Sequence, residues 1–151
     1  MTTTPLVATA TVTVRVGIDD AFRLFTEDID LWWRRGTMYW NDAERALGYR
    51  LEPVRGGRLV EVYDEKTGEG FEIGRVSEWD PPRRVVFGWR LKDWPEDAAT
   101  TVAVAFETVP EGTRVTVEHS GWETFGGPGA QLTAGYVRGW KELLGWYSEA
   151  A

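Results

Sequence analysis

An alternation of apolar and polar residues opens the chain. In TATVTVRV, residues 9–16, every second side chain is apolar, and those between are threonine or arginine. The apolar positions are Ala10, Val12, Val14 and Val16. Because successive side chains of a strand point to opposite faces, this pattern predicts a β-strand with one face on the core and the other in water.

Two short segments with helical spacing follow this strand. Phe22 and Phe25 lie three positions apart and predict a first helix, which Asp19 or Asp20 can cap. A second helix is predicted within EDIDLWWRR, residues 27–35. Its apolar positions, at i, i+3 and i+4, are Ile29, Trp32 and Trp33. The second helix would therefore bury one side.

From about residue 47 the pattern changes to strands and turns. Turns that contain glycine or proline separate four segments with strand character: LEPV, RLVEVYD, FEIGRVSEW and RVVFGWR. Two more alternating segments follow the loop LKDWPEDAAT. The inward faces of the last three strands are expected to carry Val85, Phe87, Trp89, Val102, Val104, Phe106, Val115, Val117 and His119. This order predicts an antiparallel meander of six strands, with a bulge at Gly74.

One long helix is predicted for residues 129–148. At about 100° per residue, its apolar stripe consists of Leu132, Tyr136, Gly139, Trp140, Leu143 and Tyr147. A sheet and a helix that each have one apolar side can bury both by packing together. The predicted fold class is therefore α+β, a curved antiparallel sheet of about seven strands wrapped around the C-terminal helix. We expect a flexible N-terminus at residues 1–5 and a single domain over residues 6–151.

Composition narrows the classes of function. The chain has 151 residues and a net charge of −7, which disfavours nucleic-acid binding because phosphate contacts need clustered Lys and Arg. With no cysteine and one histidine, neither a disulfide nor a usual zinc site is expected, and no cofactor is predicted. No stretch is long enough for a membrane span, and the start of the chain lacks a signal-peptide pattern. We therefore expect a cytoplasmic protein.

The aromatic content is the unusual feature of the composition. The chain has nine Trp, five Tyr and six Phe, and LWWRRGTMYW, residues 31–40, is a dense aromatic stretch. Large aromatic side chains bury roughly 150–250 Å² each, so such clustering needs a reason. The stretch could be ordinary core, a partner surface or the wall of a ligand cavity. The cavity wall is the interpretation that we favour.

The order of elements, with the WW pair ending the second short helix, resembles the helix-grip superfamily of START domains, the birch pollen allergen and polyketide cyclases. Within it, the chain resembles the branch named for the activator of a heat-shock chaperone's ATPase. The similar stretches are AFRLFTEDIDLWW, RGGRLVEVYDE, GRVSEWDPPRRVVFGWR, TRVTVEHSGW and GWKELLGWY. One departure is Arg34, which stands where the branch often has proline after WW.

This resemblance implies a cavity between the sheet and the long helix, closed at one end by the two short helices. Trp33 or Trp32 would plug that end, and Tyr39 and Trp40 would lie at the rim. Two loops could gate the opening or be plain connectors: WETFGGPGA, and LKDWPED with an exposed Trp94.

His119 carries the most chemistry among the candidate residues. Alternation places it beside Val117 on an inward face, where burial would favour the neutral ring. It could orient a ligand, act as a general base, or be a core histidine satisfied by a backbone carbonyl. Glu61 could partner it if it points inward, because a buried carboxylate needs a donor or a charge, but a solvated edge position fits equally. The orientations of Glu72 and Arg75 are open in the same way.

Ten residues are predicted to bind the ligand. They are Trp33, Trp40, Glu61, Phe87, Trp89, Phe106, Val117, His119, Tyr136 and Trp140. Their rings would form flat walls, with His119 and the Tyr136 hydroxyl as polar anchors. Gly139 would leave room for the ligand or for a close backbone approach. No metal-binding residue is predicted.

Three functions remain open. The leading hypothesis is a protein that encloses a hydrophobic, aromatic small molecule, as a carrier, a sensor or a sequestering protein; the resemblance implies relatives that sequester antibiotics. The alternative is a cyclase- or dehydratase-type enzyme, a lyase or isomerase acting on a polyketide-like substrate with His119 as acid or base. A co-chaperone ranks last, because the branch's namesake has additional domain sequence, so a chaperone partner is not expected. The chain could also form a homodimer.

Overall fold

The computed structural model describes residues 6–35 and 39–151, so the flexible N-terminus predicted for residues 1–5 lies outside the described residues. The order of elements is the predicted one, with a short 3₁₀ helix, η1, added before the last helix. The elements are β1 (Ala8–Val14), α1 (Ile18–Phe25), α2 (Ile29–Trp32), β2 (Gly48–Leu51), β3 (Arg58–Val62), β4 (Gly70–Asp80), β5 (Arg84–Trp89), β6 (Thr100–Val109), β7 (Gly112–Ser120), η1 (Trp122–Phe125) and α3 (Gly129–Ala150).

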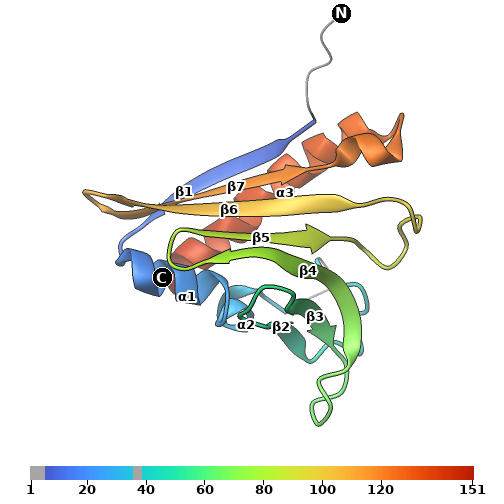
Figure 1. Cartoon of the computed structure of the whole chain (residues 1–151), viewed down its shortest axis with the longest axis horizontal. Helices are drawn as coiled ribbons and strands as arrows, with labels where there is room; N and C mark the ends of the chain where they lie inside the picture. Colours follow the sequence, from blue (N-terminus) through green and yellow to red (C-terminus); the bar gives the residue numbers. More distant parts are fainter. Residues whose placement is uncertain (1–5, 36–38) are drawn as a thin grey trace, which may run out of the picture.

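The strands form one seven-stranded antiparallel sheet in the order β1-β7-β6-β5-β4-β3-β2. In Figure 1, α3 runs behind the sheet, and α1 and α2 lie near the C-terminal end of α3. At the right of Figure 1, β4 curves downward, and β3 and β2 lie below it. This arrangement confirms the expected α+β helix-grip fold.

Strand β4 carries the irregularities that bend the sheet. Its pairing with β3 shifts between Leu59 and Val60, which leaves Ile73 as an extra residue beside Gly74. Its pairing with β5 shifts again, between Val76 and Glu78. Bulges of this kind increase the local bend and twist of a strand. The bulge predicted at Gly74 is therefore confirmed, displaced by one position.

Two details of the predicted elements are wrong. LEPV is not a strand, because β2 spans Gly48–Leu51 and ends before Pro53, which has no N–H to donate to a neighbouring strand. The N-cap of α1 is Gly17 instead of Asp19 or Asp20. Both aspartates lie in the first turn of α1, where their negative charges interact favourably with the helix dipole.

The core lies between α3 and the sheet and continues beneath α1 and α2. The inward-facing residues predicted for the last three strands are all buried: Val85, Phe87, Trp89, Val102, Val104, Phe106, Val115, Val117 and His119. The Tyr147 hydroxyl of α3 donates to the Ala21 carbonyl of α1 at 2.7 Å, so a hydrogen bond also joins these two layers.

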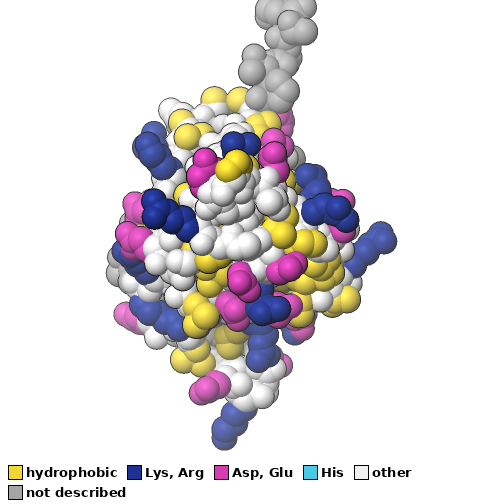
Figure 2. Space-filling view, turned by 90° about the vertical axis from the view of Figure 1, so that its left-hand side faces the viewer, with side chains coloured by type: hydrophobic (Ala, Val, Ile, Leu, Met, Phe, Trp, Pro, Cys, Tyr) yellow, Lys and Arg dark blue, Asp and Glu magenta, His cyan; other side chains and the backbone are white. Residues whose placement is uncertain are grey.

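The surface is mixed in charge. On the face drawn in Figure 2, acidic and basic side chains are interspersed with apolar ones, and no basic patch gathers there. Within residues 6–35 and 39–151, no helix is both long and apolar enough to cross a membrane.

Candidate functional site

A pocket of about 320 Å³ lies between α3 and the sheet. Three segments line it: a loop after α2, the end of β5 with the residues just beyond it, and the first four turns of α3. The lining residues are Tyr39, Trp40, Asn41, Trp89, Leu91, Gln131, Leu132, Gly135, Tyr136, Gly139, Trp140 and Leu143. In the described part of the chain, no cluster of three or more acidic or histidine side chains could hold a metal ion.

Glycines on α3 leave the space that the pocket occupies. A Cβ added to Gly135 would meet no atom within 4 Å. At Gly139, the nearest atom to an added Cβ is Cε1 of Tyr39, at 3.5 Å. The ring of Tyr39 therefore lies across from the bare helix surface, and the pocket extends along that surface.

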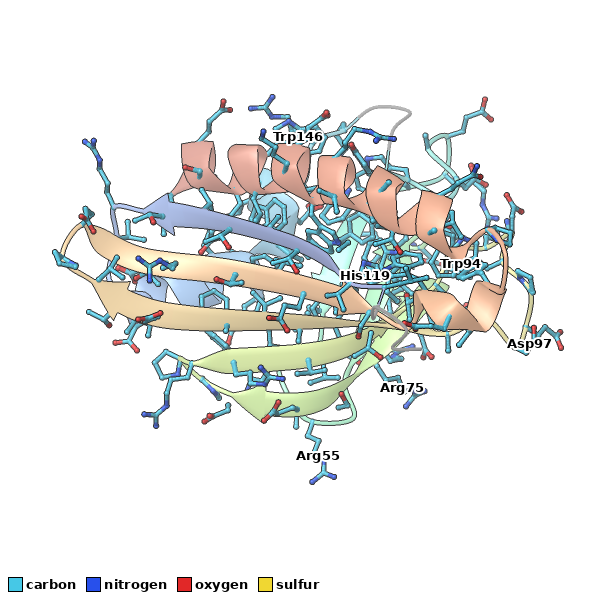
Figure 3. The ribbon with its side chains drawn as sticks, turned by 90° about the horizontal axis from the view of Figure 1, so that it is seen from above. Arg55, Arg75, Trp94, Asp97, His119 and Trp146 are labelled. Atoms are coloured by element: carbon cyan, nitrogen blue, oxygen red, sulfur yellow. The ribbon has the colours of Figure 1, made fainter. Side chains whose placement is uncertain are left out.

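His119 lies on β7 beneath α3 (Figure 3) and is 0% exposed. Nε1 of Trp140 donates to His119 Nδ1 at 3.0 Å, so the ring proton resides on Nε2. That N–H donates to Oγ1 of Thr100 at 2.8 Å. The Thr100 hydroxyl in turn donates to the Trp89 carbonyl at 2.7 Å. The histidine thereby links Trp140 on α3 to Trp89 on β5, two walls of the pocket.

This hydrogen-bond chain leaves His119 no free nitrogen. Burial also lowers the pKa of the ring to about 3, which keeps it neutral. His119 is not among the residues that line the pocket. A general base must lie within hydrogen-bond reach of the proton that it removes. Both ring nitrogens of His119 are instead hydrogen-bonded to protein groups, to Trp140 and Thr100. In this structure His119 is a neutral positioning residue, and the predicted roles of polar anchor and acid or base do not fit its geometry.

Glu61 is likewise 0% exposed, so its interpretation as a solvated edge residue is wrong. Oε1 accepts from the Asn41 backbone N–H at 2.7 Å and from the Asn41 amide at 3.2 Å. It also lies 3.3 Å from the Tyr49 hydroxyl, whose single proton it shares with the nearer Tyr39 carbonyl, at 2.8 Å. Oε2 accepts from the Asp42 N–H at 2.9 Å and from the Tyr63 hydroxyl at 2.6 Å. Among the described residues, none of these donors is His119, so the predicted pair is not formed. Glu61 instead fixes the loop that forms one pocket wall.

The two tyrosines beside Glu61 remain hydrogen-bond donors. Burial, followed by the Glu61 charge, raises the pKa of Tyr49 above its ordinary value. Burial and the hydrogen bond to Glu61 raise the pKa of Tyr63 in the same direction. Both hydroxyls therefore keep the protons that the carboxylate needs.

Tyr39 adopts a left-handed backbone conformation, with φ 66°. In a residue other than glycine this costs about 1–3 kcal/mol and persists only where neighbours impose it. Its carbonyl accepts from Trp33 Nε1 at 3.2 Å and from the Tyr49 hydroxyl at 2.8 Å. Its ring packs edge-on against Trp146 of α3, with centroids 5.6 Å apart. Hydrogen bonds on one side and α3 on the other thus impose the position of Tyr39.

Arg34, the departure from the branch's proline, connects the same region to α3. Its guanidinium forms an ion pair with Glu149 and lies 5.3 Å from the ring centroid of Trp146. Its carbonyl accepts from Trp40 Nε1 at 2.9 Å. Because both charged side chains are exposed, the ion pair contributes at most about 1 kcal/mol. A proline at this position could not form the two side-chain contacts.

Four of the ten predicted ligand-binding residues line the pocket. They are Trp40, Trp89, Tyr136 and Trp140. The other six are buried outside it: Trp33, Glu61, Phe87, Phe106, Val117 and His119. Trp33 packs edge-on against Tyr49, with centroids 4.6 Å apart, so it lies behind the wall. The pocket lies against the N-terminal half of α3. Phe106 does not reach it because its ring packs against Phe22 of α1.

Of the other eight lining residues, Tyr39 was predicted at the rim and Gly139 was predicted to leave room for the ligand. The remaining six were not predicted to bind: Asn41, Leu91, Gln131, Leu132, Gly135 and Leu143. Those on α3 had a signal in the sequence, because the lining follows two rows with a spacing of four. The rows are Gln131, Gly135, Gly139 and Leu143, and Leu132, Tyr136 and Trp140. Positions four apart lie on one helix face. Asn41 and Leu91 lie outside helices and strands, where no periodic pattern marks them.

Trp94 is not the exposed residue that was expected. It is partly buried, and its ring packs edge-on against Phe125, with centroids 4.8 Å apart, and against Trp122 at 5.7 Å. Glu72 and Arg75 pair with each other at 3.1 Å, and both side chains are solvent-exposed, which settles their orientation. Gating by the loops remains a prediction.

Solved structures of other proteins are similar to this one. A protein from Mesorhizobium loti matches with a TM-score of 0.69 at 16% identity, over 95% of each chain. The Aha1 dimer from Colwellia psychrerythraea matches with a TM-score of 0.59 at 18% identity, over 95% of this chain and 94% of that one. An anthrahydroquino-γ-pyrone synthase, Txn09, matches with a TM-score of 0.61 at 26% identity, over 96% of each chain. No curated protein matches the chain significantly.

The sequence also matches a family model over most of its length. The match covers residues 15–145, from just after β1 into α3, and includes every residue that lines the pocket. The family is described as Activator of Hsp90 ATPase homolog 1-like protein. The chain therefore belongs to the Activator of Hsp90 ATPase homolog 1-like family, within the helix-grip superfamily that its sequence resembles.

Proposed function

We propose that the protein binds a flat, hydrophobic, aromatic small molecule in the pocket between α3 and the sheet. The observation that carries the proposal is the wall of the pocket, which presents five aromatic rings around a space left open by two helix glycines. The rings are Tyr39, Trp40, Trp89, Tyr136 and Trp140. Small-molecule pockets are mostly apolar and span about 300–1,000 Å³, so 320 Å³ suits a small fused-ring ligand.

The supporting residues favour a pocket that is formed before the ligand arrives. His119 holds Trp140 and the strand that carries Trp89, and Glu61 holds the backbone of the loop that carries Trp40. A site with fixed walls loses less conformational entropy on binding. Buried hydrogen-bond networks are therefore well placed to support ligand affinity without touching the ligand.

The first test is a tryptophan-fluorescence titration with aromatic polyketides, flavonoids, sterols and fatty acids, followed by mass measurement of each ligand. We expect saturable quenching with the flat aromatic members of the panel. A binder at 100-fold its dissociation constant should add roughly 2.7 kcal/mol to the free energy of unfolding. No quenching and no stabilisation by any member would contradict the proposal.

A matched pair of glycine variants localises the binding. Gly135→Leu fills the pocket, whereas Gly145→Leu places the same side chain on an exposed part of α3 outside it. An added Cβ has no atom within 4 Å at either position, so both variants should fold. We expect Gly135→Leu to abolish saturable binding and Gly145→Leu to retain it. Equal binding by both variants would place the ligand elsewhere.

A cyclase-type enzyme, a lyase or isomerase acting on a polyketide-like molecule, is the second candidate. Its support is the 26% identity to the anthrahydroquino-γ-pyrone synthase over 96% of each chain. Because His119 has no free nitrogen, it is not the acid or base of such a reaction in this structure. A changed ligand mass in the titration would favour this candidate, and an unchanged mass would favour a carrier or sequestering protein.

The remaining proposals concern partners and location. Membership of the family keeps chaperone activation as a third candidate, tested by binding to the chaperone and stimulation of its ATPase. A homodimer is proposed from the sequence, and the similarity to the Aha1 dimer of Colwellia psychrerythraea makes the oligomeric state worth measuring. A cytoplasmic location agrees with a chain that has no cysteine.

A further inference from the structure

Tyr136 lines the pocket, and its hydroxyl group accepts one hydrogen bond and has an O–H that can donate another. Its oxygen accepts a hydrogen bond from Trp89 Nε1 at 3.2 Å. Within residues 6–35 and 39–151, no acceptor takes the hydroxyl proton. A tyrosine hydroxyl can accept and donate at the same time, so this proton is available to a ligand.

The packing around Tyr136 fixes the position of its hydroxyl oxygen. Its ring lies against Trp122, with centroids 4.5 Å apart, and edge-on against His119, at 4.9 Å. Trp94 covers a third side at 6.2 Å. A ring enclosed in this way cannot swing out of the wall, so its hydroxyl oxygen is held in place before a ligand arrives.

Most other polar side chains on the inner wall of the pocket already have hydrogen-bond partners. Asn41 accepts from the Lys92 N–H at 2.9 Å and donates to Glu61 at 3.2 Å. The indole N–H groups of Trp40 and Trp140 donate to the Arg34 carbonyl and to His119. Gln131 is exposed, and Tyr39 packs beside Trp146 on the outer part of α3. Tyr136 is therefore the anchor that the inner wall offers.

We propose that Tyr136 donates its hydroxyl proton to a carbonyl-type oxygen of the ligand, so that the pocket takes planar aromatic ketones or quinones in preference to hydrocarbons of the same shape. This inference rests on the proposed function and adds the chemical class of the ligand. Burial raises the pKa of Tyr136 to about 12, so the hydroxyl remains a donor at neutral and mildly alkaline pH. The neighbouring rings provide the surface on which the ligand stacks, and Tyr136 makes the pocket prefer a ligand with a carbonyl oxygen.

Two probes of nearly equal shape test the inference, namely anthraquinone-2-sulfonate and anthracene-2-sulfonate. Calorimetric titration of the wild-type protein should give roughly tenfold tighter binding of the quinone, the value of one good neutral hydrogen bond. Tyr136→Phe should bind both probes with the affinity that the wild-type protein has for the anthracene. The quinone's C=O stretching frequency should fall on binding to the wild-type protein, a measurement that does not depend on any variant.

Tyr147→Phe is the matched control. It removes another buried tyrosine hydroxyl from the same helix, one that donates to Ala21 outside the pocket. It should lose stability and keep the preference for the quinone.

The outcomes separate the two proposals. If neither probe binds the wild-type protein, the proposed function fails and the inference fails with it. If both probes bind equally and the C=O frequency does not change, the pocket stands and the role of Tyr136 is overturned. A preference that survives in Tyr136→Phe would also overturn it.

Discussion

At the scale of single residues, His119 makes the free energy of unfolding depend on pH, because its buried ring stays neutral in the folded protein. Its pKa falls from 6.5 in the unfolded chain to about 3 in the folded protein because the ring is buried. Between these values the unfolded chain binds more protons, so stability falls as the pH drops below 6.5. From pH 7 to pH 5 this residue alone should remove about 2 kcal/mol from the free energy of unfolding.

Urea unfolding of the wild-type protein and of His119→Gln at both pH values isolates that contribution. Glutamine keeps a donor and an acceptor but has no proton to gain, so the variant should lose about 2 kcal/mol less than the wild-type protein over this range. An identical pH dependence would mean that His119 is not held neutral in the folded state.

Glu61 is a second residue whose effect follows from its hydrogen-bond inventory. Each of its partners is a donor: two backbone N–H groups, the Asn41 amide and two tyrosine hydroxyls. Glu61→Gln turns one acceptor oxygen into a donor that faces another donor, which should cost about 1–3 kcal/mol of unfolding free energy. Amide exchange of Asn41 and Asp42 should accelerate. Glu72→Gln, at an exposed ion pair, should change stability by less than about 0.5 kcal/mol.

At the scale of elements, the sheet bends where the backbones of two strands meet. A Cβ on Gly74 of β4 would lie 1.7 Å from the Gly88 carbonyl oxygen of β5, whereas a Cβ on Gly88 would have its nearest neighbour at 3.7 Å. Gly74→Ala should therefore cost about 2 kcal/mol or more of unfolding free energy, because backbone must move. Gly88→Ala should be close to neutral. Urea denaturation that ranks the two variants in the opposite order would contradict this account of the bend.

Helices and strands could be predicted from the sequence where a single repeat, the alternation of a strand or the spacing of a helix, sets which side chains are buried. Alternation placed Val117 and His119 correctly on an inward face, and helical spacing placed Tyr136 and Trp140 on the buried stripe of α3. LEPV failed because proline ends a strand whatever the surrounding pattern. Alternation also could not orient Glu61, since both faces of β3 carry apolar residues. Most donors to its carboxylate come from residues 41–49, outside β3, which the alternation within the strand does not reveal.

At the scale of the whole molecule, the pocket exists because three segments distant in sequence are fastened together. Asn41 joins two of them: its Nδ2 donates to Glu61 on β3 at 3.2 Å, and its Oδ1 accepts from Lys92 beyond β5 at 2.9 Å. α3 supplies the third segment through the Tyr39 ring against Gly139. The aromatic residues of these segments could be predicted from the sequence. The way in which the segments come together could not, because it depends on polar contacts between loops. This is why the aromatic residues of the lining could be predicted, whereas Asn41 and Leu91 could not.

The two side-chain hydrogen bonds of Asn41 can be tested with one substitution that removes the amide group and one that replaces it with a carboxylate of nearly the same shape. Asn41→Ala removes both side-chain bonds and should cost about 1–2 kcal/mol of unfolding free energy. Asn41→Asp keeps the acceptor for Lys92 but places a second carboxylate against the buried Glu61, so at pH 7 it should be the more destabilising of the two. Adding Glu61→Gln should recover part of the loss in Asn41→Asp and none in Asn41→Ala. Urea unfolding of the wild-type protein, the two Asn41 variants, Glu61→Gln alone and the two double variants gives the coupling directly. An Asn41→Asp protein as stable as Asn41→Ala would show that this loop is not held to β3 by the Asn41 amide.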